Sequence, residues 1–261
     1  MRLAISLLTT ICAFGQSNVY LPEKLSAADR ALFGILAKAE LEALWAAVVA
    51  EGYPAPFINE LDALQLGRKM VGRARTIRYL PNRKDLRDKI YAAGPQLNYK
   101  SSEEAHPGDI LVFDAGGETR SAVTGVMTTT RFFARGGVGM IADGAFRDVP
   151  AMEKLPIQVY MRRGQAAAVS PVMMSVDYQV PVRIGGVTVV PGDILVGERH
   201  GILVIPAEIA ANVGERATAT VEREEFQHEL LLKGESIYQV YPRLSEEKQK
   251  QFEQWKAKRR K

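Results

Sequence analysis

The sequence predicts an α/β protein with a β-rich centre and a helical segment at each end. Apolar residues recur at helical spacing from Ser26 to Gly52 and again from Pro206 to Lys233. Between these segments lie short runs rich in β-branched residues, separated by Pro-Gly and Gly-Gly turns. The 261 residues are 47% hydrophobic and 25% charged. This is an ordinary globular composition, and the chain is long enough to bury one substantial core.

Residues 1–16 have the pattern of a secretory signal. Met1-Arg2 is a short basic region, an apolar run follows, and small residues at Ala13 and Gly15 suit cleavage nearby. The apolar run is too short to span a bilayer comfortably. We therefore expect an exported protein, periplasmic or extracellular, that is not stably inserted in a membrane after cleavage. The alternative is an N-terminal core helix. Cys12 is the single cysteine, so the mature chain would have no disulfide or thiolate ligand.

Residues 17–66 are expected to form an N-terminal helical segment. Ser26, with Asp29 three residues later, is typical of a helix start, and apolar residues continue at helical spacing to Gly52. Prolines end this long helix, and a short second helix is expected over 58–66.

The core is expected over residues 67–206. The run 69–80 alternates like a strand, in which Gly72 marks a bulge or a close approach of another backbone. The hexapeptide Pro-Gly-Asp-Ile-Leu-Val occurs at 107–112 and again at 191–196, and each copy is a turn that leads into a strand. The polar segment 82–100 is expected to be a loop with a short helix. Further strands are expected at 158–161, 166–169, 202–205, and at 180–190, folded as a hairpin at Gly185-Gly186.

Residues 207–261 are expected to be helical, with a helix that ends at Gly234, a final helix from Ser245, and a basic tail. The formal net charge is +4, and the last six residues alone carry five cations, so the rest of the chain is near neutral. Nucleic-acid binding needs a basic face on the folded domain. We therefore expect no nucleic-acid partner and a solvated tail.

The stretch 125–148 is the strongest candidate for a functional site. Thr124 is expected to cap a helix that buries Met127, Phe132 and Phe133, and Gly136-Gly137 to end it. The apolar run 138–142 that follows is typical of a strand buried on both faces.

Three charged residues, Asp143, Arg147 and Asp148, come after this predicted strand. Ligands of open α/β sheets bind beyond the carboxyl ends of the strands, where these residues would lie. Carboxylates of Asp143 and Asp148 suit Mg²⁺ or Mn²⁺, and Arg147 suits a substrate carboxylate. The free N–H groups of the helix start near Gly125 suit a carboxylate as well. The alternative is that Arg147 and Asp148 are solvated loop charges.

Other chemistries lack their motifs. There is no G-x-x-x-x-G-K-[ST] or G-x-G-x-x-G for a nucleotide and no G-x-S-x-G for a serine nucleophile. The three histidines, His106, His200 and His228, are scattered rather than spaced for zinc.

Four stretches, in this order, resemble the RraA-like family, which includes 4-hydroxy-4-methyl-2-oxoglutarate aldolases and oxaloacetate decarboxylases. They are GRKMVGRART at 67–76, PGDILVFDAGG at 107–117, the helix from Gly125 that leads to DGAFRD, and VPVRIGGVTVVPGDILVGERHGILVIPAE at 180–208. The resemblance covers about residues 60 to 235.

The resemblance implies a swivelling β/β/α barrel-like domain with added N- and C-terminal helices, assembled as a homotrimer with sites between subunits. It also implies a Mg²⁺- or Mn²⁺-dependent lyase, a class II pyruvate aldolase or oxaloacetate decarboxylase, that releases pyruvate from a small 2-oxo acid. Carried over onto this chain, Asp148 resembles the metal-anchoring carboxylate and Arg147 the arginine that contacts the substrate. The backbone of Gly125, Val126 and Met127 resembles the loop that holds the pyruvyl carboxylate.

Two positions depart from the family pattern. Val126 stands where the family commonly has an acidic residue after the glycine, and Ala151 stands where it has Asp or Glu three residues after the aspartate. These changes keep a second hypothesis open: a non-catalytic binding or regulatory protein on the same scaffold.

Overall fold

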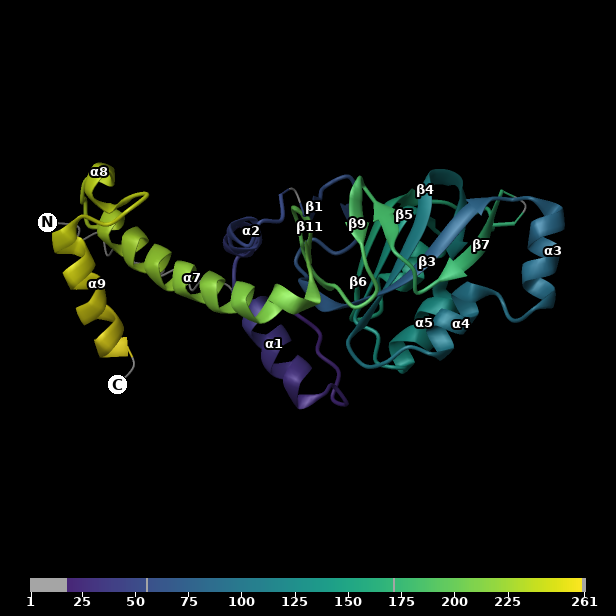
Figure 1. The fold of residues 1–261 in the computed structure, drawn as a ribbon, viewed down its shortest axis with the longest axis horizontal. Coiled ribbons are helices and arrows are strands. Elements are labelled where there is room, and N and C mark those ends of the chain that lie inside the picture. The colour runs from purple at the N-terminus through teal and green to yellow at the C-terminus, as the bar shows by residue number, and fades with distance from the viewer. Residues whose placement is uncertain (1–17, 55, 171, 260–261) are drawn as a thin grey trace, which may run out of the picture.

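The computed structural model describes residues 18–54, 56–170 and 172–259 (Figure 1). The predicted secretory signal, residues 1–16, lies outside the described residues. The strands are β1 (Phe57–Ile58), β2 (Asp62–Ala63), β3 (Met70–Pro81), β4 (Asp109–Thr124), β5 (Gly139–Phe146), β6 (Gln158–Gly164), β7 (Met173–Tyr178), β8 (Val182–Ile184), β9 (Val187–Val189), β10 (Ile194–Glu198) and β11 (Gly201–Ile205). The helices are α1 (Ala27–Lys38), α2 (Leu41–Ala50), α3 (Lys84–Ala92), α4 (Leu97–Glu103), α5 (Val126–Ala134), α6 (Val149–Met152), the 3-10 turn η1 (Ala207–Ile209), α7 (Ala210–Leu232), α8 (Ile237–Val240) and α9 (Glu246–Arg259).

One mixed sheet organises the molecule, in the order β1-β11-β10-β3-β4-β5-β6-β2, with β7 also paired to β3. Strands β3, β4, β5 and β6 are parallel to one another, while β10 and β11 are antiparallel to their neighbours. The predicted α/β class is therefore confirmed. The order has two ends, so the sheet is open among the described strands, and its mixed, curved arrangement is compatible with the expected barrel-like domain.

The two Pro-Gly-Asp turns lead into the two strands on either side of β3. Gly108 and Gly192 have φ of +91° and +93°, a backbone conformation that glycine adopts without strain. Strand β4 then runs parallel to β3 and β10 antiparallel to it. A Cβ on Gly72 would lie 2.5 Å from the Gly108 carbonyl oxygen, so the predicted close backbone approach at Gly72 is confirmed.

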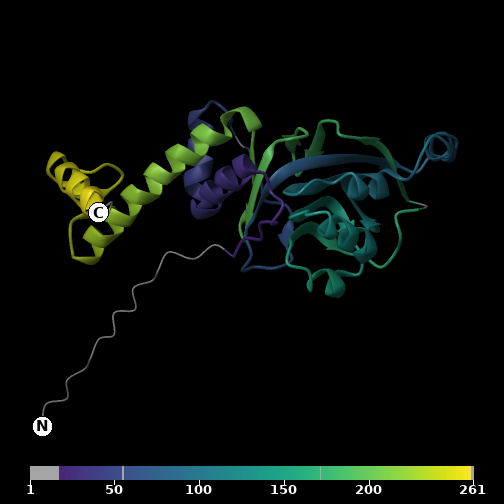
Figure 2. The same cartoon turned by 90° about the horizontal axis from the view of Figure 1, so that it is seen from below.

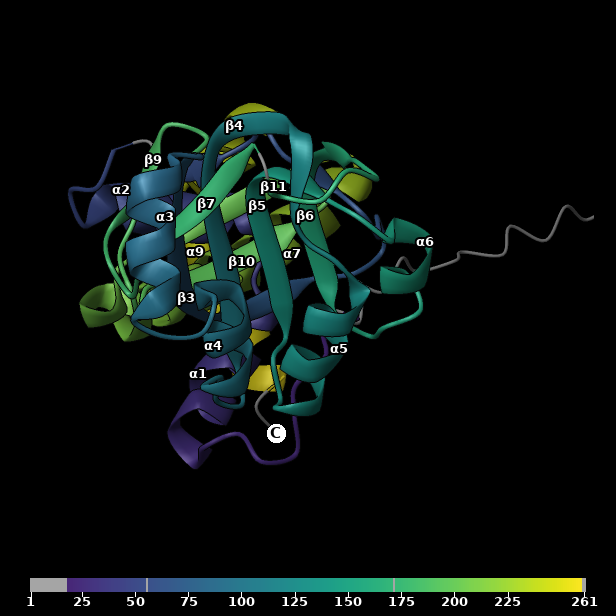
Figure 3. The same cartoon turned by 90° about the vertical axis from the view of Figure 1, so that its right-hand side faces the viewer.

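Three apolar clusters hold the body together. The first lies between α1, α2, the start of α7, and strands β10 and β11; the second lies under α4 and α5; the third lies between the sheet and the β8–β9 hairpin. Figure 3 shows α4 and α5 together on one side of β4 and β5. The predicted hairpin turn at Gly185-Gly186 is confirmed, and both glycines have positive φ there.

The C-terminal helices form an arm that leaves the body. The first half of α7 packs on α1 and α2 through Val213 and Ala217, whereas its second half extends away and carries α8 and α9 (Figures 1 and 2). The arm has its own small core of Phe226, Leu230, Val240 and Phe252. As predicted, Gly234 ends α7 with φ +88°. Among the described residues, no helix combines the length and apolarity needed to cross a bilayer.

The prediction of one long helix over 26–52 is wrong, because the chain forms two helices there. The first does begin after Ser26, whose side chain accepts the Asp29 N–H, but Ala39 is extended between α1 and α2. The buried Lys69 ammonium donates to the Ala39 carbonyl at 2.6 Å. In a continuous helix, a backbone N–H of the helix would compete for this carbonyl. This interruption depends on a residue thirty positions away.

Several shorter predictions are also corrected. Residues 58–66 are not helical but contain the last residue of β1 and all of β2, and these strands pair with β11 and β6. The segment 82–100 forms two helices rather than one, and 166–169 makes only an isolated bridge, while the strand β7 follows it. The short helix α8 is not among the predicted elements.

Candidate functional site

The predicted site lies where β4 and β5 end beside the start of α5. Thr124, the last residue of β4, is in register with Phe146, the last residue of β5. The Arg147 N–H donates to the Thr124 carbonyl at 3.1 Å. This pairing brings the loop at Gly125 next to the Arg147-Asp148 dipeptide, although the two are separated by more than twenty residues of sequence.

Asp148 connects the two segments. Its Oδ2 accepts the Val126 N–H at 3.2 Å and lies 3.6 Å from Arg147 Nε. Its backbone is left-handed, with φ +58°, and it precedes α6. Asp tolerates this conformation better than most residues. The side chains of Arg147 and Asp148 are 45% and 42% exposed, so both groups remain open to a ligand.

Gly125 is required here by space rather than by backbone conformation. Its φ of −141° is extended, and it precedes the first residue of α5. A Cβ at this position would lie 2.5 Å from Asp148 Oδ2 and 2.8 Å from Arg147 Nε. The absence of a side chain therefore lets the carboxylate and the guanidinium approach the start of α5.

The helix start itself differs from the prediction. Thr124 belongs to β4 and Gly125 is the N-cap of α5, while Met127 is 81% exposed instead of buried. The first N–H groups of a helix have no intrahelical acceptor. The Val126 N–H already donates to Asp148, so the Met127 N–H is the next one along the helix that could donate to a bound carboxylate.

Two buried hydroxyls near this loop were not predicted from the sequence. Thr124 Oγ1 and Ser121 Oγ are both buried and have no hydrogen-bond partner in the part of the chain that the structure describes. Thr124 immediately precedes Gly125, so an unpaired polar atom lies one residue from the loop. Nothing in the sequence distinguishes these from other strand hydroxyls.

Asp143 does not belong to this site, which corrects the prediction that it joins Asp148 at a metal. Strand β5 continues to Phe146, so Asp143 lies inside it and is 5% exposed. Its carboxylate pairs with Arg162 and accepts the Gly185 N–H at 3.1 Å. Asp143 thus attaches the β8–β9 hairpin to the sheet.

The donor set at Asp148 suits one kind of metal. Among the described residues, no group of three or more His, Cys, Asp or Glu side chains could hold an ion. Val126 and Ala151 add no carboxylate. Mg²⁺ commonly takes one or two carboxylates and keeps several waters, whereas structural zinc needs four protein ligands. The single carboxylate of Asp148 therefore fits a hydrated Mg²⁺ or Mn²⁺ that a chelating ligand helps to hold.

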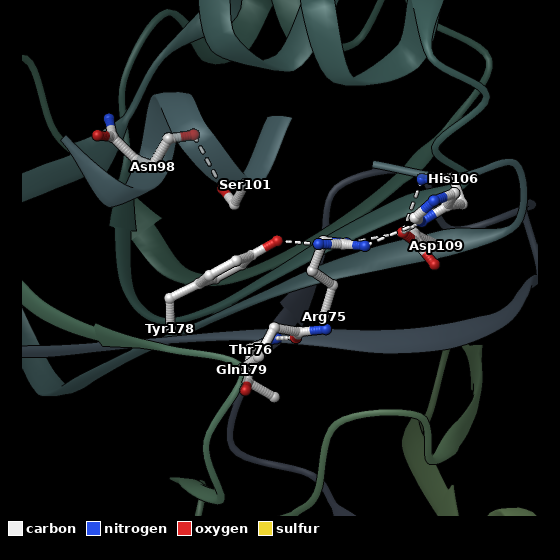
Figure 4. Close-up of polar contacts among 8 residues, drawn as sticks. All are labelled: Arg75, Thr76, Asn98, Ser101, His106, Asp109, Tyr178 and Gln179. Atoms are coloured by element: carbon white, nitrogen blue, oxygen red, sulfur yellow. Dashed lines mark hydrogen bonds and ion pairs between the residues drawn. The ribbon is translucent and has the colours of Figure 1, made fainter. Parts of the chain in front are cut away.

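A second polar cluster surrounds Arg75 and has a structural role (Figure 4). The Arg75 guanidinium donates to Asp109 Oδ2 at 2.8 Å, contacts the Tyr178 hydroxyl, and lies 3.0 Å from His106 Nδ1. Asp109 also accepts the His106 N–H at 2.8 Å. These bonds join β3, the first Pro-Gly-Asp turn and β7, and they satisfy a buried arginine.

Comparisons with known proteins match the sequence of this chain to a family. The family model RraA-like, described as Aldolase/RraA, matches residues 49–204. A putative 4-hydroxy-4-methyl-2-oxoglutarate aldolase of Halalkalibacterium halodurans is 33% identical over 161 residues, which is 61% of this chain and 68% of that protein. A 4-hydroxy-4-methyl-2-oxoglutarate aldolase of Thermus thermophilus is 28% identical over 142 residues, 53% of this chain and 76% of that one.

Solved structures agree with the fold. Streptomyces coelicolor RraAS2, described as an unusual member of the RNase ES inhibitor RraA protein family, is 28% identical with a TM-score of 0.68, covering 79% of this chain and 98% of that one. An uncharacterized protein of Pseudomonas syringae pv. tomato is 23% identical with the same TM-score and covers 81% and 96%. The chain belongs to the RraA-like family.

Proposed function

We propose that the protein is a divalent-metal-dependent lyase that cleaves a C–C bond of a small 2-oxo acid and releases pyruvate. The observation that carries this proposal is the convergence of the Gly125 loop, Arg147 and Asp148 at the ends of β4 and β5. Relatives named as 4-hydroxy-4-methyl-2-oxoglutarate aldolases support it. In such a reaction the electron pair of the broken bond stays on the pyruvyl part, which is then protonated to pyruvate, while the other part leaves as CO₂ from oxaloacetate or, after loss of its hydroxyl proton, as a carbonyl compound from a 4-hydroxy-2-oxo acid.

Each residue has a role in this proposal. Asp148 Oδ1 would hold Mg²⁺ or Mn²⁺ while Oδ2 stays on the Val126 N–H. The chemistry that the ion supplies when bound is Lewis-acid polarisation of the 2-oxo group. The Met127 N–H would bind the substrate carboxylate at the helix start. The Arg147 guanidinium would donate to the oxygen on which negative charge develops, where a preorganised cation has its greatest effect.

The test is pyruvate release by purified protein with Mg²⁺ and either oxaloacetate or a 4-hydroxy-2-oxo acid, measured with a coupled lactate dehydrogenase assay. A blank with Mg²⁺ and no protein corrects for spontaneous decarboxylation. We expect Asp148→Ala to reduce the rate at least about 100-fold, since it removes the one metal-anchoring group. A chelator should have the same effect on the wild type.

The chain offers a matched control for this test. Arg87-Asp88 is the same dipeptide on the exposed helix α3, with its own ion pair at 3.1 Å. Asp88→Ala should leave pyruvate release unchanged. An Asp148→Ala rate equal to that of Asp88→Ala, or activity that survives chelation, contradicts the proposed mechanism.

The second candidate function is binding without catalysis. Val126 and Ala151 favour it, because the loop and α6 lack the two acidic groups that the family resemblance leads one to expect. Calorimetric titration with oxalate, a stable mimic of the pyruvate enolate, separates the candidates. Mg²⁺-dependent oxalate binding without pyruvate release from any oxo acid of the panel supports a binding protein, and turnover contradicts it.

Assembly and export complete the proposal. We infer a homotrimer built on the family core and an exported chain without residues 1–16, and we assign no nucleic-acid partner. Light scattering of the purified protein gives the subunit number. N-terminal sequencing of protein from the periplasm or medium is expected to begin near Ser17, and an intact Met1 there would contradict export through a cleaved signal.

A further inference from the structure

The arm meets the body at a groove that α2, α7 and the chain after α8 form together. It has a volume of about 550 Å³ and is lined by apolar residues that include Trp45, Phe57 and Tyr241. Trp45 is 43% exposed and Tyr241 55% exposed. Two carboxylates, Glu42 and Glu224, line the same groove, as does His200, whose Nδ1 lies 3.8 Å from Glu42 Oε1.

Helix α2 is apolar on nearly every side, and Glu42 is its one charged residue. A helix that is apolar all round is normally covered on all sides. Here Leu41, Leu44 and Val48 face the body, while Trp45 and Val49 remain exposed. The outer face of α2 therefore has the composition of a contact surface.

The basic end of α9 complements this groove in charge and chemistry. Lys256, Lys258 and Arg259 end the helix, and Arg260 and Lys261 follow in the sequence. Among the described residues, Lys258 is exposed and has no ion-pair partner. A lysine can lay its aliphatic stem on an aromatic ring and place its ammonium beside a carboxylate. Trp45 with Glu42 and Glu224 provides that combination.

The end of α9 does not face the groove of its own chain. Arg259 Nη1 pairs with Glu225 Oε2 at 2.5 Å, which fixes the end of α9 beside the second half of α7. Glu224, the adjacent residue, lines the groove, and successive helical residues point about 100° apart. Figure 1 shows α9 descending below the level of α7 while α2 lies above it.

We propose that the basic end of α9 of one copy docks in the Trp45 groove of a second copy. Because every copy has both surfaces, a two-fold arrangement makes the contact twice. The family match ends at residue 204, before the arm begins. The arm contact pairs two copies, or two trimers where the core forms a trimer. This assembly is independent of the proposed lyase activity.

Charge reversal tests the contact by light scattering at about 0.1 M salt, where the Debye length is about 10 Å. We expect Glu42→Lys with Glu224→Lys, and separately Lys256→Glu with Lys258→Glu, to halve the molar mass of the wild-type assembly. The chain with all four changes should recover the wild-type mass. Lys24→Glu with Lys89→Glu is the matched control on exposed lysines of the body, and should not change the mass. Equal masses for all variants overturn the proposal, as does failure of the four-fold variant to recover.

A second measurement uses only the wild-type protein, so it tests the proposal even if a charge-reversal variant fails to fold. An equal mixture of ¹⁵N-labelled and unlabelled full-length protein is treated with a carbodiimide, which joins a lysine to a carboxylate in contact with it. Mass spectrometry should then find Lys258 joined to Glu42 or Glu224 in pairs of mixed isotope. Once subunits have exchanged in the mixture, single-isotope pairs alone would mean that the tail docks on its own chain, and absence of the Lys258 cross-link would mean that it docks on neither; both results overturn the proposal.

Discussion

At the residue scale, Gly125 controls the geometry of the site with little effect on the fold. A Cβ there would meet the ends of the Asp148 and Arg147 side chains, which are exposed and can move, and not packed backbone. We expect Gly125→Ala to displace Asp148 from the Val126 N–H and to reduce both oxalate affinity and pyruvate release at least about 10-fold, because small misplacements at a reacting centre are costly. The melting temperature should change by only a few degrees.

Gly67→Ala is the control for this prediction, since no atom of the described residues lies within 4 Å of its added Cβ and its φ is ordinary. Calorimetry with oxalate and thermal unfolding of both variants provide the measurements. A Gly125→Ala protein that binds oxalate as tightly as Gly67→Ala would show that the Gly125 loop does not shape the site.

Each of the two Pro-Gly-Asp turns contains an aspartate, and only one of the two, Asp109, has a cationic partner among the described residues. Asp109 has a cationic partner, Arg75, which is itself buried, and the pair lies at 2.8 Å. Asp109→Asn leaves this guanidinium without a carboxylate. We expect a loss on the order of 3 kcal/mol in the free energy of unfolding at pH 7, as for other broken buried pairs. Urea unfolding measures it, and a loss below about 1 kcal/mol would contradict this role.

Asp193 has no cationic partner among the described residues, and burial raises the pKa of its carboxyl above the ordinary value, although the Val190 N–H bond opposes this. A raised folded-state pKa means that stabilisation by the protonated form is present at low pH and is lost as pH rises through that pKa. Asn cannot ionise and can still accept the Val190 N–H. We therefore expect Asp193→Asn to raise the melting temperature at pH 7 and to have little effect near pH 4. A uniform shift at both pH values would contradict this cause.

Two residues of the candidate site could be proposed from the sequence for a physical reason. Arg147 and Asp148 are adjacent in the chain and follow an apolar strand, and the position of such residues is set by local rules. The role of Asp143 could not be predicted from the sequence, because it depends on Arg162 of β6 and on Gly185 of the β8–β9 hairpin. The contact between Val126 and Asp148 is equally non-local.

At the element scale, strongly periodic segments were predicted well and interruptions were not. Helix α7 has a proline before it and a glycine after it, and both limits are local signals. The break between α1 and α2 has no such signal, since the chain is extended at Ala39 where the Lys69 ammonium binds its carbonyl. Strands β1 and β2 are two residues each and exist only because larger strands offer them an edge.

The arm is an element whose stability we expect to be separate from that of the body. Its core residues belong to none of the three clusters of the body. Phe252 is 6% exposed and packs on Phe226 and Trp255. Phe252→Ala should cost about 3–5 kcal/mol locally. Hydrogen exchange should become faster in α8 and α9 and stay unchanged in β3, β4 and β5; faster exchange throughout would show that arm and body unfold as one unit.

At the scale of the whole molecule, the family match does not coincide with the folding unit. It ends at residue 204, at the last strand, but α1, α2 and the first half of α7 cover the face formed by β10 and β11. Leu203 and Ile205 are fully buried under these helices. The body should therefore need α7 up to about Val221, whereas the arm beyond it should be dispensable for folding.

Two truncations separate these parts. A chain that ends at Arg223 keeps Val213 and Ala217 in place and loses only the arm. We expect it to melt like the body of the full chain and to retain pyruvate release. A chain that ends at Pro206 exposes the core that Val213 covers, and burial of one valine alone contributes about 1.5–3 kcal/mol. Its free energy of unfolding should fall by at least that amount in urea titration. If the shorter chain were as stable as the longer one, α7 would be no part of the body's core, and its first half would have to be assigned to the arm.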